Sequence, residues 1–431
     1  MSQREKIVIT GMGAVTPVGV GVDAYWAGLM KGRCGIDRIH RFDAGDLAVQ
    51  IAAEVKDFRV EDHMPAKLIR ETDAFTQFAF AAAREAIEDA MGAGKKTAAP
   101  SAEDGSAGAI PASPERMGIV MGTAMSGIDT IASTQEILTN AVHKNVGPRF
   151  VPRILGNIAA AQIAIYYGMT GPSYTISTAC ASGGDAISES AMLLLAGETD
   201  AVLAVGADST LCPLVIYSLA NAGALSREKD DPEGACRPFD RNAGGFVMGE
   251  GGGAIVLETE THAKARGARI YAELAGWANN NDAWHVTSPL KDGSMAAECM
   301  MRALEKAGLE PEDIDYVNAH GTGALKSDEA EVAAMNRVFR GSSKKGGGHG
   351  PAISGLKAAT GHMMGACGIT EAIACIKAIE TGSIPPTLNL KDPVSRMDLV
   401  TDPREGCSIN VAMSNAFGFG GQNATIILRG C

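Results

Sequence analysis

Short apolar runs alternate with helix-spaced patterns along this chain. Residues 117–122, 201–207 and 253–258 are each apolar runs too short for a helix and bounded by turn residues, so they predict buried strands. Residues 7–9 form a similar run, which predicts a strand ending in a glycine turn at Gly11 and Gly13. We do not interpret this turn as a dinucleotide-binding site, because the third glycine of the glycine-rich dinucleotide-binding motif is missing.

Helical spacing of apolar residues appears between these strands. The pattern from residue 73 to 91 predicts an alanine-rich helix that packs closely on another element. The remaining elements that the pattern predicts are helices at 23–31, 182–196, 293–307, 327–339 and 365–380 and strands at 314–318, 352–354, 408–414 and 423–428. This alternation predicts parallel strands covered by helices on both faces. The alternation of strands and helices starts again after residue 257, which indicates a duplicated architecture without a literal sequence repeat.

Length and composition agree with two core units. The chain has 431 residues, 46% of them hydrophobic and 20% charged, with 52 glycines, as is typical of a compact protein with many close backbone contacts. Two stretches, 92–116 and 341–351, are rich in small residues, glycine and proline and are predicted to be surface excursions.

Charge and cysteine usage exclude several classes of function. The net charge of −12 and the lack of a basic run argue against nucleic-acid binding. No apolar stretch of about 18 residues occurs, and the first residues lack a signal-peptide core, so we expect no membrane span and a cytoplasmic protein. The nine cysteines lack zinc-site spacing and suit a reducing compartment in which thiols stay free.

Cys180 is the first candidate for chemistry. Between residues 175 and 187 a strand passes through small residues directly into a helix, which puts Cys180 near the helix N-terminus. The helix dipole is expected to lower the pKa of the thiol there and to make thiolate available. The alternative, a buried cysteine packed as a small hydrophobic residue, stays open on this segment alone.

Two histidines and one glycine-rich segment have similar settings. His320 and His362 each follow a predicted strand in a loop of glycine and threonine, where α/β proteins bind ligands. Either one could be a satisfied core histidine, but together they favour a site. Residues 415–423 alternate phenylalanine with glycine, which is typical of a mobile lid, with a plain turn as the alternative.

Four segments together resemble one family over essentially the whole chain. They are residues 178–182 around Cys180, residues 318–322 around His320, Lys357 with residues 360–362, and residues 417–421. This combination resembles the β-ketoacyl-[acyl-carrier-protein] synthases of the thiolase superfamily, and most closely their type II elongating enzymes. The resemblance implies a thiolase-like α/β fold in which two pseudo-duplicated βαβ halves form an αβαβα five-layer sandwich. The halves are expected at residues 1–262 and 263–431.

The resemblance also implies roles for individual residues. Cys180 would carry the acyl group as a thioester, with its oxyanion held by backbone N–H groups of Cys180 and Phe419, and Phe417 would complete the gate. His320 and His362 would stabilise the enolate formed when malonyl-carrier protein loses carbon dioxide. Lys357 would hold the charge and geometry of the site, supported by the acids Asp328, Glu331 and Glu371. No cofactor is implied.

Partners and specificity follow from the same resemblance. Met125 falls where the family sets the depth of its acyl pocket. Lys67, Arg70 and Arg227, with Arg149 and Arg153 as weaker candidates, would dock an acidic acyl carrier protein, unless they are merely solvated surface charges. A homodimer is expected. The positions that match a structural monovalent cation site are Asn318, Glu371, Ser414 and Asn415.

The sequence departs from the family pattern at a few positions. Ala324 and Leu325 follow Gly323 where the family usually continues with threonine, and Asp185 stands at a position that is commonly apolar or histidine. No catalytic group is lost, but the departures leave partner contacts and acyl preference open.

The expected activity is a decarboxylative Claisen condensation in fatty acid chain elongation. A degradative thiolase would need a second reactive cysteine where Phe417 and Phe419 stand, and a cysteine hydrolase has no use for two loop histidines. An inactive chain-length partner subunit would lack the nucleophile. A ketosynthase of a type II polyketide or specialised lipid pathway stays open.

Overall fold

The computed structural model describes residues 5–92, 109–140, 146–340 and 350–431. Most of the two predicted surface excursions, 92–116 and 341–351, lies outside these residues. Among the described helices, none is long and apolar enough to cross a membrane.

Two sets of five strands have the same topology. In spatial order the first set is β1 (Ile7–Thr16), β8 (Gly251–Thr259), β7 (Ala201–Asp208), β5 (Met117–Gly122) and β6 (Ser173–Ile176). The second is β9 (Ala272–Asn281), β13 (Gln422–Arg429), β12 (Val411–Gly418), β10 (Tyr316–Asn318) and β11 (Ala352–Ser354). Within each set the strands follow the chain order first, fifth, fourth, second, third. This repeated topology confirms the two pseudo-duplicated halves of a thiolase-like fold.

The two sets touch through a short antiparallel pairing of β1 with β9, in which Val8 lies opposite Glu273 and Ile9 opposite Ala272. Two small strands, β3 (Ile36–Arg38) and β4 (Ile51–Ala53), form a separate sheet, and β2 (Gly19–Val20) pairs with the end of β1.

The strand directions differ from the prediction. Only β5, β6 and β7, and likewise β10, β11 and β12, run parallel, whereas β8 is antiparallel to both of its neighbours and β13 is antiparallel to β12 and β9. The prediction of a wholly parallel arrangement is wrong because no helix separates β12 from β13. A turn at residues 419–421 joins them, and so short a connection allows only antiparallel pairing.

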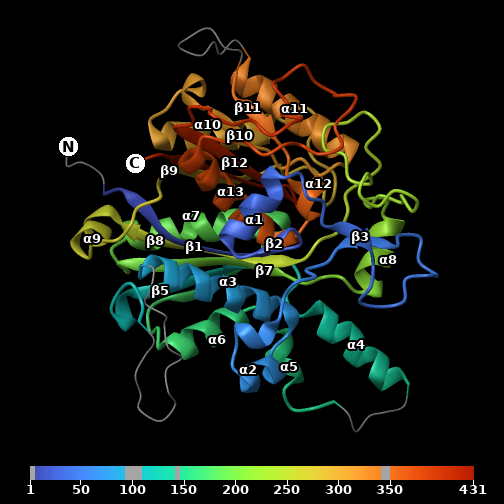
Figure 1. The fold of residues 1–431 in the computed structure, drawn as a ribbon, viewed down its shortest axis with the longest axis horizontal. Helices are drawn as coiled ribbons and strands as arrows, with labels where there is room; N and C mark the ends of the chain where they lie inside the picture. The colour runs from blue at the N-terminus through green and yellow to red at the C-terminus, as the bar shows by residue number, and fades with distance from the viewer. Residues whose placement is uncertain (1–4, 93–108, 141–145, 341–349) are drawn as a thin grey trace.

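Figure 1 shows five layers: helices above, the second set of strands, helices between the sets, the first set of strands, and helices below. The helices that the sequence pattern predicted are α1 (Val22–Met30), α3 (Ala74–Ala90), α7 (Ser182–Leu195), α10 (Ser294–Ala307), α11 (Leu325–Phe339) and α13 (Cys367–Thr381). Those that it did not predict are α2 (Ala66–Glu71), α4 (Ile128–Thr139), α5 (Phe150–Ile154), α6 (Ile158–Tyr167), α8 (Pro213–Asn221), α9 (Glu260–Ala265) and α12 (Lys357–Thr360).

The glycines of β1 lie inside the strand and form no turn, so that prediction is corrected. A Cβ atom on Gly13 would come within 2.0 Å of the Ala82 carbonyl oxygen, and one on Gly11 within 2.1 Å of the Ala86 carbonyl oxygen. Helix α3 therefore packs its backbone directly against β1, as the alanine-rich pattern predicted. The glycines provide this close approach, and the strand continues to Thr16.

The two central helices, α7 and α13, meet at glycines in the same way. A Cβ atom on Gly368 would lie 2.3 Å from the Gly184 nitrogen, and one on Gly183 would lie 2.6 Å from the Gly365 carbonyl oxygen. Each helix follows a short 3-10 turn, η4 (Ala179–Ala181) or η6 (Met364–Ala366), whose first residue has a left-handed φ of 52° or 51°. The starts of the two helices therefore lie side by side at the centre of the molecule.

Candidate active site

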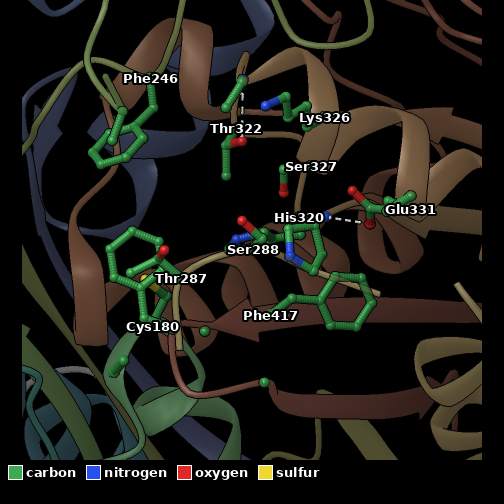
Figure 2. Close-up of a pocket in the computed structure, with 18 of the residues that line it drawn as sticks. Cys180, Phe246, Thr287, Ser288, His320, Thr322, Lys326, Ser327, Glu331 and Phe417 are labelled. Carbon is green, nitrogen blue, oxygen red and sulfur yellow. Dashed lines mark hydrogen bonds between the residues drawn. The ribbon is translucent and has the colours of Figure 1, made fainter. Parts of the chain in front are cut away.

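A cavity of about 320 Å³ opens where the two helix starts meet. Cys180 lines it from the first half of the chain, and His320, His362 and Phe417 line it from the second. Figure 2 shows Cys180, His320 and Phe417 around this cavity on different elements, with Thr322, Lys326 and Ser327 also on the wall. Met125, Glu331 and Phe419 line the cavity as well, whereas Lys357, Asp328 and Glu371 are buried outside its lining.

Cys180 is held by a tight junction between η4 and α7, which confirms its predicted place at a helix start. Ala179 adopts a left-handed φ of 52°, and the Thr178 N–H donates to Ser182 Oγ over 2.9 Å. Gly418 lies against this turn, where a Cβ atom would be 2.7 Å from the Thr178 carbonyl oxygen and 3.1 Å from the Cys180 nitrogen. The fixed turn aims Sγ into the cavity and leaves no room for a side chain at residue 418.

The electrostatics of Cys180 correct the expected thiolate. Burial raises the pKa of the thiol to about 11, although Lys357 and hydrogen bonds from the backbone N–H groups of Phe419 and Cys180 act to lower it. Desolvation therefore outweighs the positive surroundings of the helix start, and the resting group is a thiol at neutral pH. Those two N–H groups are the donors that the resemblance assigned to the oxyanion.

His362 is buried with its Nδ1 atom occupied. The Met364 backbone N–H donates to Nδ1 over 3.3 Å, and Cys367 Sγ lies 3.3 Å from the same atom. Burial and the Lys357 charge lower the pKa of the imidazole well below its ordinary value, so the ring is neutral. Because Nδ1 accepts, the ring proton belongs on Nε2, which can donate a hydrogen bond.

His320 stands next to it with its ring nearly perpendicular. The ring centroids are 5.5 Å apart at 83°, and the Phe417 ring lies 5.7 Å from His320. Burial lowers the pKa of His320 well below its ordinary value, with Lys357 acting in the same direction. Both histidines are thus neutral at physiological pH, which suits hydrogen-bond donation better than proton abstraction.

The two predicted acids near His320 hold the backbone and do not contact its ring. Glu331 accepts the N–H groups of His320 and Gly321 over 2.7 and 2.8 Å. Asp328 accepts the N–H groups of Thr322 over 3.0 Å and Phe239 over 2.8 Å. Burial raises the pKa of each carboxyl to about 7. They fix the loop that presents His320.

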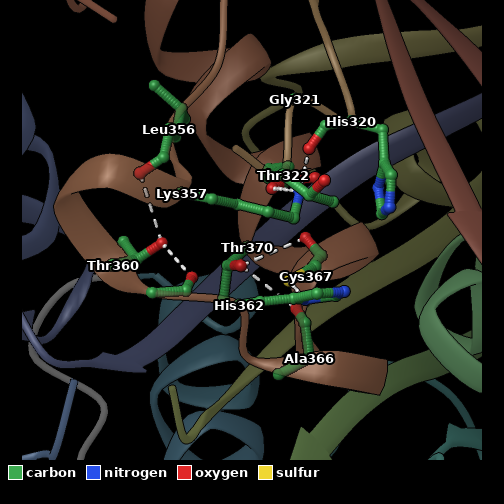
Figure 3. A network of polar contacts seen from close by, with 12 residues as sticks. His320, Gly321, Thr322, Leu356, Lys357, Thr360, His362, Ala366, Cys367 and Thr370 are labelled. Atoms are coloured by element: carbon green, nitrogen blue, oxygen red, sulfur yellow. Dashed lines mark hydrogen bonds and ion pairs between the residues drawn. The ribbon is translucent and has the colours of Figure 1, made fainter. Parts of the chain in front are cut away.

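Lys357 is fully buried and makes two short contacts. Its Nζ donates to Glu371 Oε1 over 2.5 Å and to the His320 carbonyl oxygen over 2.6 Å, and Figure 3 shows the second of these. Burial lowers the pKa of Lys357, but the Glu371 carboxylate more than offsets this and holds the pKa above its ordinary value. Lys357 therefore provides a permanent positive charge behind the two histidines.

The four residues expected to bind a cation are all buried beside this pair. Asn318 lies opposite Ser414 in the parallel pairing of β10 and β12, and Asn415 follows in β12. Among the described residues, Asn318 Oδ1 and Glu371 Oε2 find no hydrogen-bond partner. Unpaired amide and carboxylate oxygens fit a hard monovalent cation. No cluster of three or more His, Cys, Asp or Glu ligands occurs in the part of the chain that the structure describes.

Asp208 is a site residue that the sequence reasoning missed. It ends β7, is fully buried, and accepts the N–H groups of Ala124 and Gly365, each over 2.8 Å, and the Thr123 hydroxyl over 2.8 Å. Burial raises its pKa to about 6. Asp208 thus ties the loop that carries Met125 to the start of α13. An acid at the carboxyl end of a buried strand is the signal that could have revealed it.

The lid segment is the end of a hairpin. Residues 415–418 belong to β12 and pair with β13, and the turn at 419–421 joins the two strands, so the plain-turn alternative fits the fold better. Phe419 is 39% exposed in this turn. Gly418 packs its backbone against the turn that holds Cys180, where a Cβ atom would lie 2.7 Å from the Thr178 carbonyl oxygen.

The docking candidates lie outside the cavity lining. Lys67 and Arg70 are on α2, Arg149 pairs with Glu71 over 3.2 Å, and Arg153 lies in α5. Arg227 donates to the Ala220 carbonyl oxygen over 3.0 Å, in the segment that leads to the cavity-lining residues 222–224.

Comparisons with known proteins cover both halves of the chain. Residues 4–263 match the family described as "Beta-ketoacyl synthase, N-terminal domain", and residues 271–391 match its "C-terminal domain". The chain is 37% identical over 432 residues to 3-oxoacyl-[acyl-carrier-protein] synthase 2 of Staphylococcus aureus, covering 100% of this chain and 99% of that protein. It is 37% identical over 428 residues to the protein of the same name from Coxiella burnetii, covering 99% of each.

Solved structures agree. A beta-ketoacyl synthase from Burkholderia phymatum aligns with a TM-score of 0.86 at 32% identity, over 99% of this chain and 100% of that one. The ishigamide ketosynthase/chain length factor aligns with a TM-score of 0.85 at 33% identity, and a type II polyketide ketosynthase in complex with its acyl-carrier protein with 0.84 at 30%, both over 100% of each chain. With matches over both halves and over the full length, the chain belongs to the β-ketoacyl synthase family.

Proposed function

We propose that the protein condenses an acyl group, held on Cys180, with malonyl-carrier protein to give a β-ketoacyl-carrier protein in fatty acid chain elongation. The observation that carries this is one cavity in which a cysteine at a helix start faces two neutral histidines. The full-length relatives named 3-oxoacyl-[acyl-carrier-protein] synthase 2 support the same activity.

The first half-reaction loads the enzyme. Cys180 Sγ attacks the thioester carbonyl of the acyl-carrier protein, and the negative oxygen is held by the N–H groups of Cys180 and Phe419. The carrier-protein sulfur leaves and takes up the proton that the Cys180 thiol gives up. Because the thiol pKa is about 11, this proton must be lost as the bond forms and not before.

The second half-reaction generates the nucleophile. The malonyl carboxylate leaves as carbon dioxide, and its electron pair becomes an enolate whose oxygen accepts hydrogen bonds from His362 Nε2–H and His320. The enolate carbon then attacks the acyl-Cys180 carbonyl. Collapse of this intermediate expels Cys180, which takes a proton from solvent. Lys357 stays charged throughout and favours the build-up of negative charge nearby.

Replacement of the nucleophile tests this proposal. Cys180→Ser should abolish transfer of an acyl group from acyl-carrier protein to the enzyme, because a serine hydroxyl at this turn has no base beside it. The loss reflects the nucleophile itself, since a hydroxyl is far less nucleophilic than a thiol at neutral pH. Intact-mass spectrometry of the incubated protein measures the adduct, with Cys375→Ala as a control that leaves the acyl adduct in place. A normal adduct on the Cys180→Ser variant would overturn the assignment.

The cavity wall bears on which acyl chain the protein accepts. Met125 is 36% exposed on the cavity wall, where a flexible thioether can yield to long chains. Because one similar solved structure is a type II polyketide ketosynthase and another is a ketosynthase/chain length factor, a polyketide or specialised lipid pathway is the second candidate. Mass analysis of products from malonyl-carrier protein and acyl-carrier proteins of graded length separates them, since repeated condensation without reduction yields poly-β-keto chains.

We further propose that Lys67, Arg70 and Arg227 dock the acyl carrier protein. The carrier complex of a similar ketosynthase shows that the fold accommodates such a partner. Lys67 and Arg70 lie one turn apart on α2, so an acidic helix could engage both. A cytoplasmic location stays a prediction of the sequence.

A homodimer is the proposed assembly. Tyr174 is 51% exposed on β6, the last strand of its set, and Ile165 on α6 and Met192 on α7 are 76% and 50% exposed. An unpaired edge strand flanked by exposed apolar side chains is suited to pairing with a second copy.

The oxygen atoms around Asn318 are proposed to hold a monovalent cation, with Glu371, Ser414 and Asn415 as the other ligands. Its charge would compensate the buried Glu371 carboxylate together with Lys357. The role of such an ion is structural, because it lies behind Lys357 and not in the cavity lining.

A further inference from the structure

Cys367 is a buried thiol that no step above uses. It is the first residue of α13 and is fully buried, and its Sγ lies 3.3 Å from Nδ1 of His362. Figure 3 shows the two side chains together beside Thr370. The contact is made at the ring nitrogen Nδ1, so the other ring nitrogen, Nε2, stays free to donate.

The direction of this hydrogen bond follows from a second contact. The backbone N–H of Met364 reaches the same Nδ1 atom over 3.3 Å, and an N–H group can only donate. Nδ1 must therefore be an acceptor, so Cys367 must donate its S–H. Burial raises the pKa of Cys367 and lowers that of His362, so the thiol keeps its proton and the ring stays neutral.

We propose that Cys367 is a positioning residue for decarboxylation: its S–H donates to His362 Nδ1 and holds the imidazole in the tautomer that carries its proton on Nε2. This inference rests on the proposed role of His362 in stabilising the enolate. The opposite tautomer would present a lone pair to the enolate oxygen and repel it.

The surroundings of His362 explain why a second donor matters. Its ring is confined between the Phe246 ring, with centroids 5.2 Å apart, and the His320 ring at 5.5 Å, so it has little freedom to seek other partners. The Met364 contact alone is long for an N–H···N bond. Two donors that converge on one nitrogen define the tautomer more firmly than one.

Substitutions at Cys367 separate hydrogen bonding from packing. Cys367→Ala removes the donor and should lower malonyl-carrier protein decarboxylation about three- to tenfold, as expected for one lost hydrogen bond. Cys180 acylation should not change, because His362 takes no part in it. Cys367→Ser keeps a donor and should stay within about twofold of the parent rate. Cys375→Ala is the matched control, because this fully buried cysteine of the same helix is directed toward the Met413 carbonyl oxygen.

A packing role predicts the reverse order. Cys367 adjoins the apolar Met363 and Ala366, so a residue that only fills space would tolerate alanine better than a buried hydroxyl. The proposal is overturned if Cys367→Ser decarboxylates malonyl-carrier protein more slowly than Cys367→Ala does. It is also overturned if the decarboxylation rate of Cys367→Ala equals that of the parent.

The tautomer can also be read directly in the unmodified protein. Side-chain ¹⁵N NMR, with the His362 signals assigned by comparison with His362→Ala, should show Nδ1 unprotonated in the parent and its signal shifted in Cys367→Ala. A proton on Nδ1 in the parent overturns the proposal even if no variant folds. If His362→Ala itself decarboxylates normally, the proposed function of His362 fails, which is a different result from failure of Cys367→Ala alone.

Discussion

Cys180 illustrates how opposing effects set the state of one residue. A helix start, a buried lysine and two N–H groups all favour thiolate, yet desolvation prevails and the thiol pKa lies near 11. In the proposed mechanism the same groups have a different task, which is to stabilise the oxygen that becomes negative during acyl transfer. The positive surroundings of Cys180 therefore serve the transition state more than the resting thiol.

This balance predicts the pH dependence of alkylation. Since thiolate is the reacting species, the rate of Cys180 modification by iodoacetamide should rise about tenfold per pH unit from pH 7 and level off only near pH 11. Peptide mass spectrometry of the Cys180 peptide measures it, with the exposed Cys431 as an internal comparison. If the alkylation rate of Cys180 already levels off at pH 8, the helix start outweighs desolvation in setting the thiol pKa.

The two histidines predict a split between half-reactions. His320→Ala and His362→Ala should each lose malonyl decarboxylation by more than tenfold while keeping most Cys180 acylation, because each removes a donor to the enolate only. Carbon dioxide release and acyl-adduct mass measure the two steps separately. Equal losses of both steps would mean that the histidines act on the thiol.

At the scale of elements, the site depends on two helix starts that are held together by glycines. The backbone of α7 and that of α13 touch at Gly184 and Gly368, and Asp208 ties the start of α13 to the loop of Met125. The catalytic groups are thus placed by backbone contacts, so small changes at the glycines should be felt in the cavity.

Gly368→Ala should therefore destabilise the protein by about 1–3 kcal/mol and lower activity, because the new Cβ would lie 2.3 Å from the Gly184 nitrogen. Thermal unfolding together with the condensation rate measures both effects. Gly147→Ala is the control, since no atom of the described residues lies within 4 Å of a Cβ there. Equal stability of the two variants would show that the helices separate easily.

Sequence patterns predicted those elements whose periodicity is strong. The strand at 117–122 and the one at 352–354 were placed to the residue, and α3 and α7 to within one residue or so. The pattern failed where tertiary packing decides the outcome. Gly11 and Gly13 resembled a turn because nothing in the local sequence shows that a helix backbone lies against them. Helix α6 was missed because its apolar residues are spread around the whole helix and form no one-sided pattern.

The site shows the same division. The motifs around Cys180, His320 and His362 predicted which residues meet, and the cavity brings them together. The thiol pKa could not be read from the sequence, since it depends on burial. Asp208 stands at the end of a buried strand, but its partners Ala124 and Gly365 are distant in the sequence, so the pattern does not show what it holds. The contact of Cys367 with His362 depends on the path of the backbone between them, which the sequence does not give.

The whole molecule places its exposed apolar side chains unevenly. Tyr174, Ile165 and Met192 lie on β6, α6 and α7, at the edge of the first set of strands. Tyr174→Asp combined with Ile165→Asp should halve the mass measured by light scattering after size-exclusion chromatography, because buried charges would oppose pairing. Trp284→Asp, at an equally exposed site of 66% on a different loop, should leave the mass unchanged. A parent protein that is already monomeric would contradict the proposed homodimer.

The turns before α7 and α13 also show how the two halves of the molecule correspond to each other. Ala179 and Met364 share one unusual conformation, so Gly365 holds in the second half the place that Cys180 holds in the first. If the halves descend from a common ancestor, residue 365 is the vestige of a second nucleophile. A side chain there would lie 2.7 Å from Asp208 Oδ2, and the Gly365 N–H donates to that same carboxylate. In the first half this place carries a thiol that lines the cavity, and in the second half it carries a backbone N–H that fixes the start of α13 to Asp208.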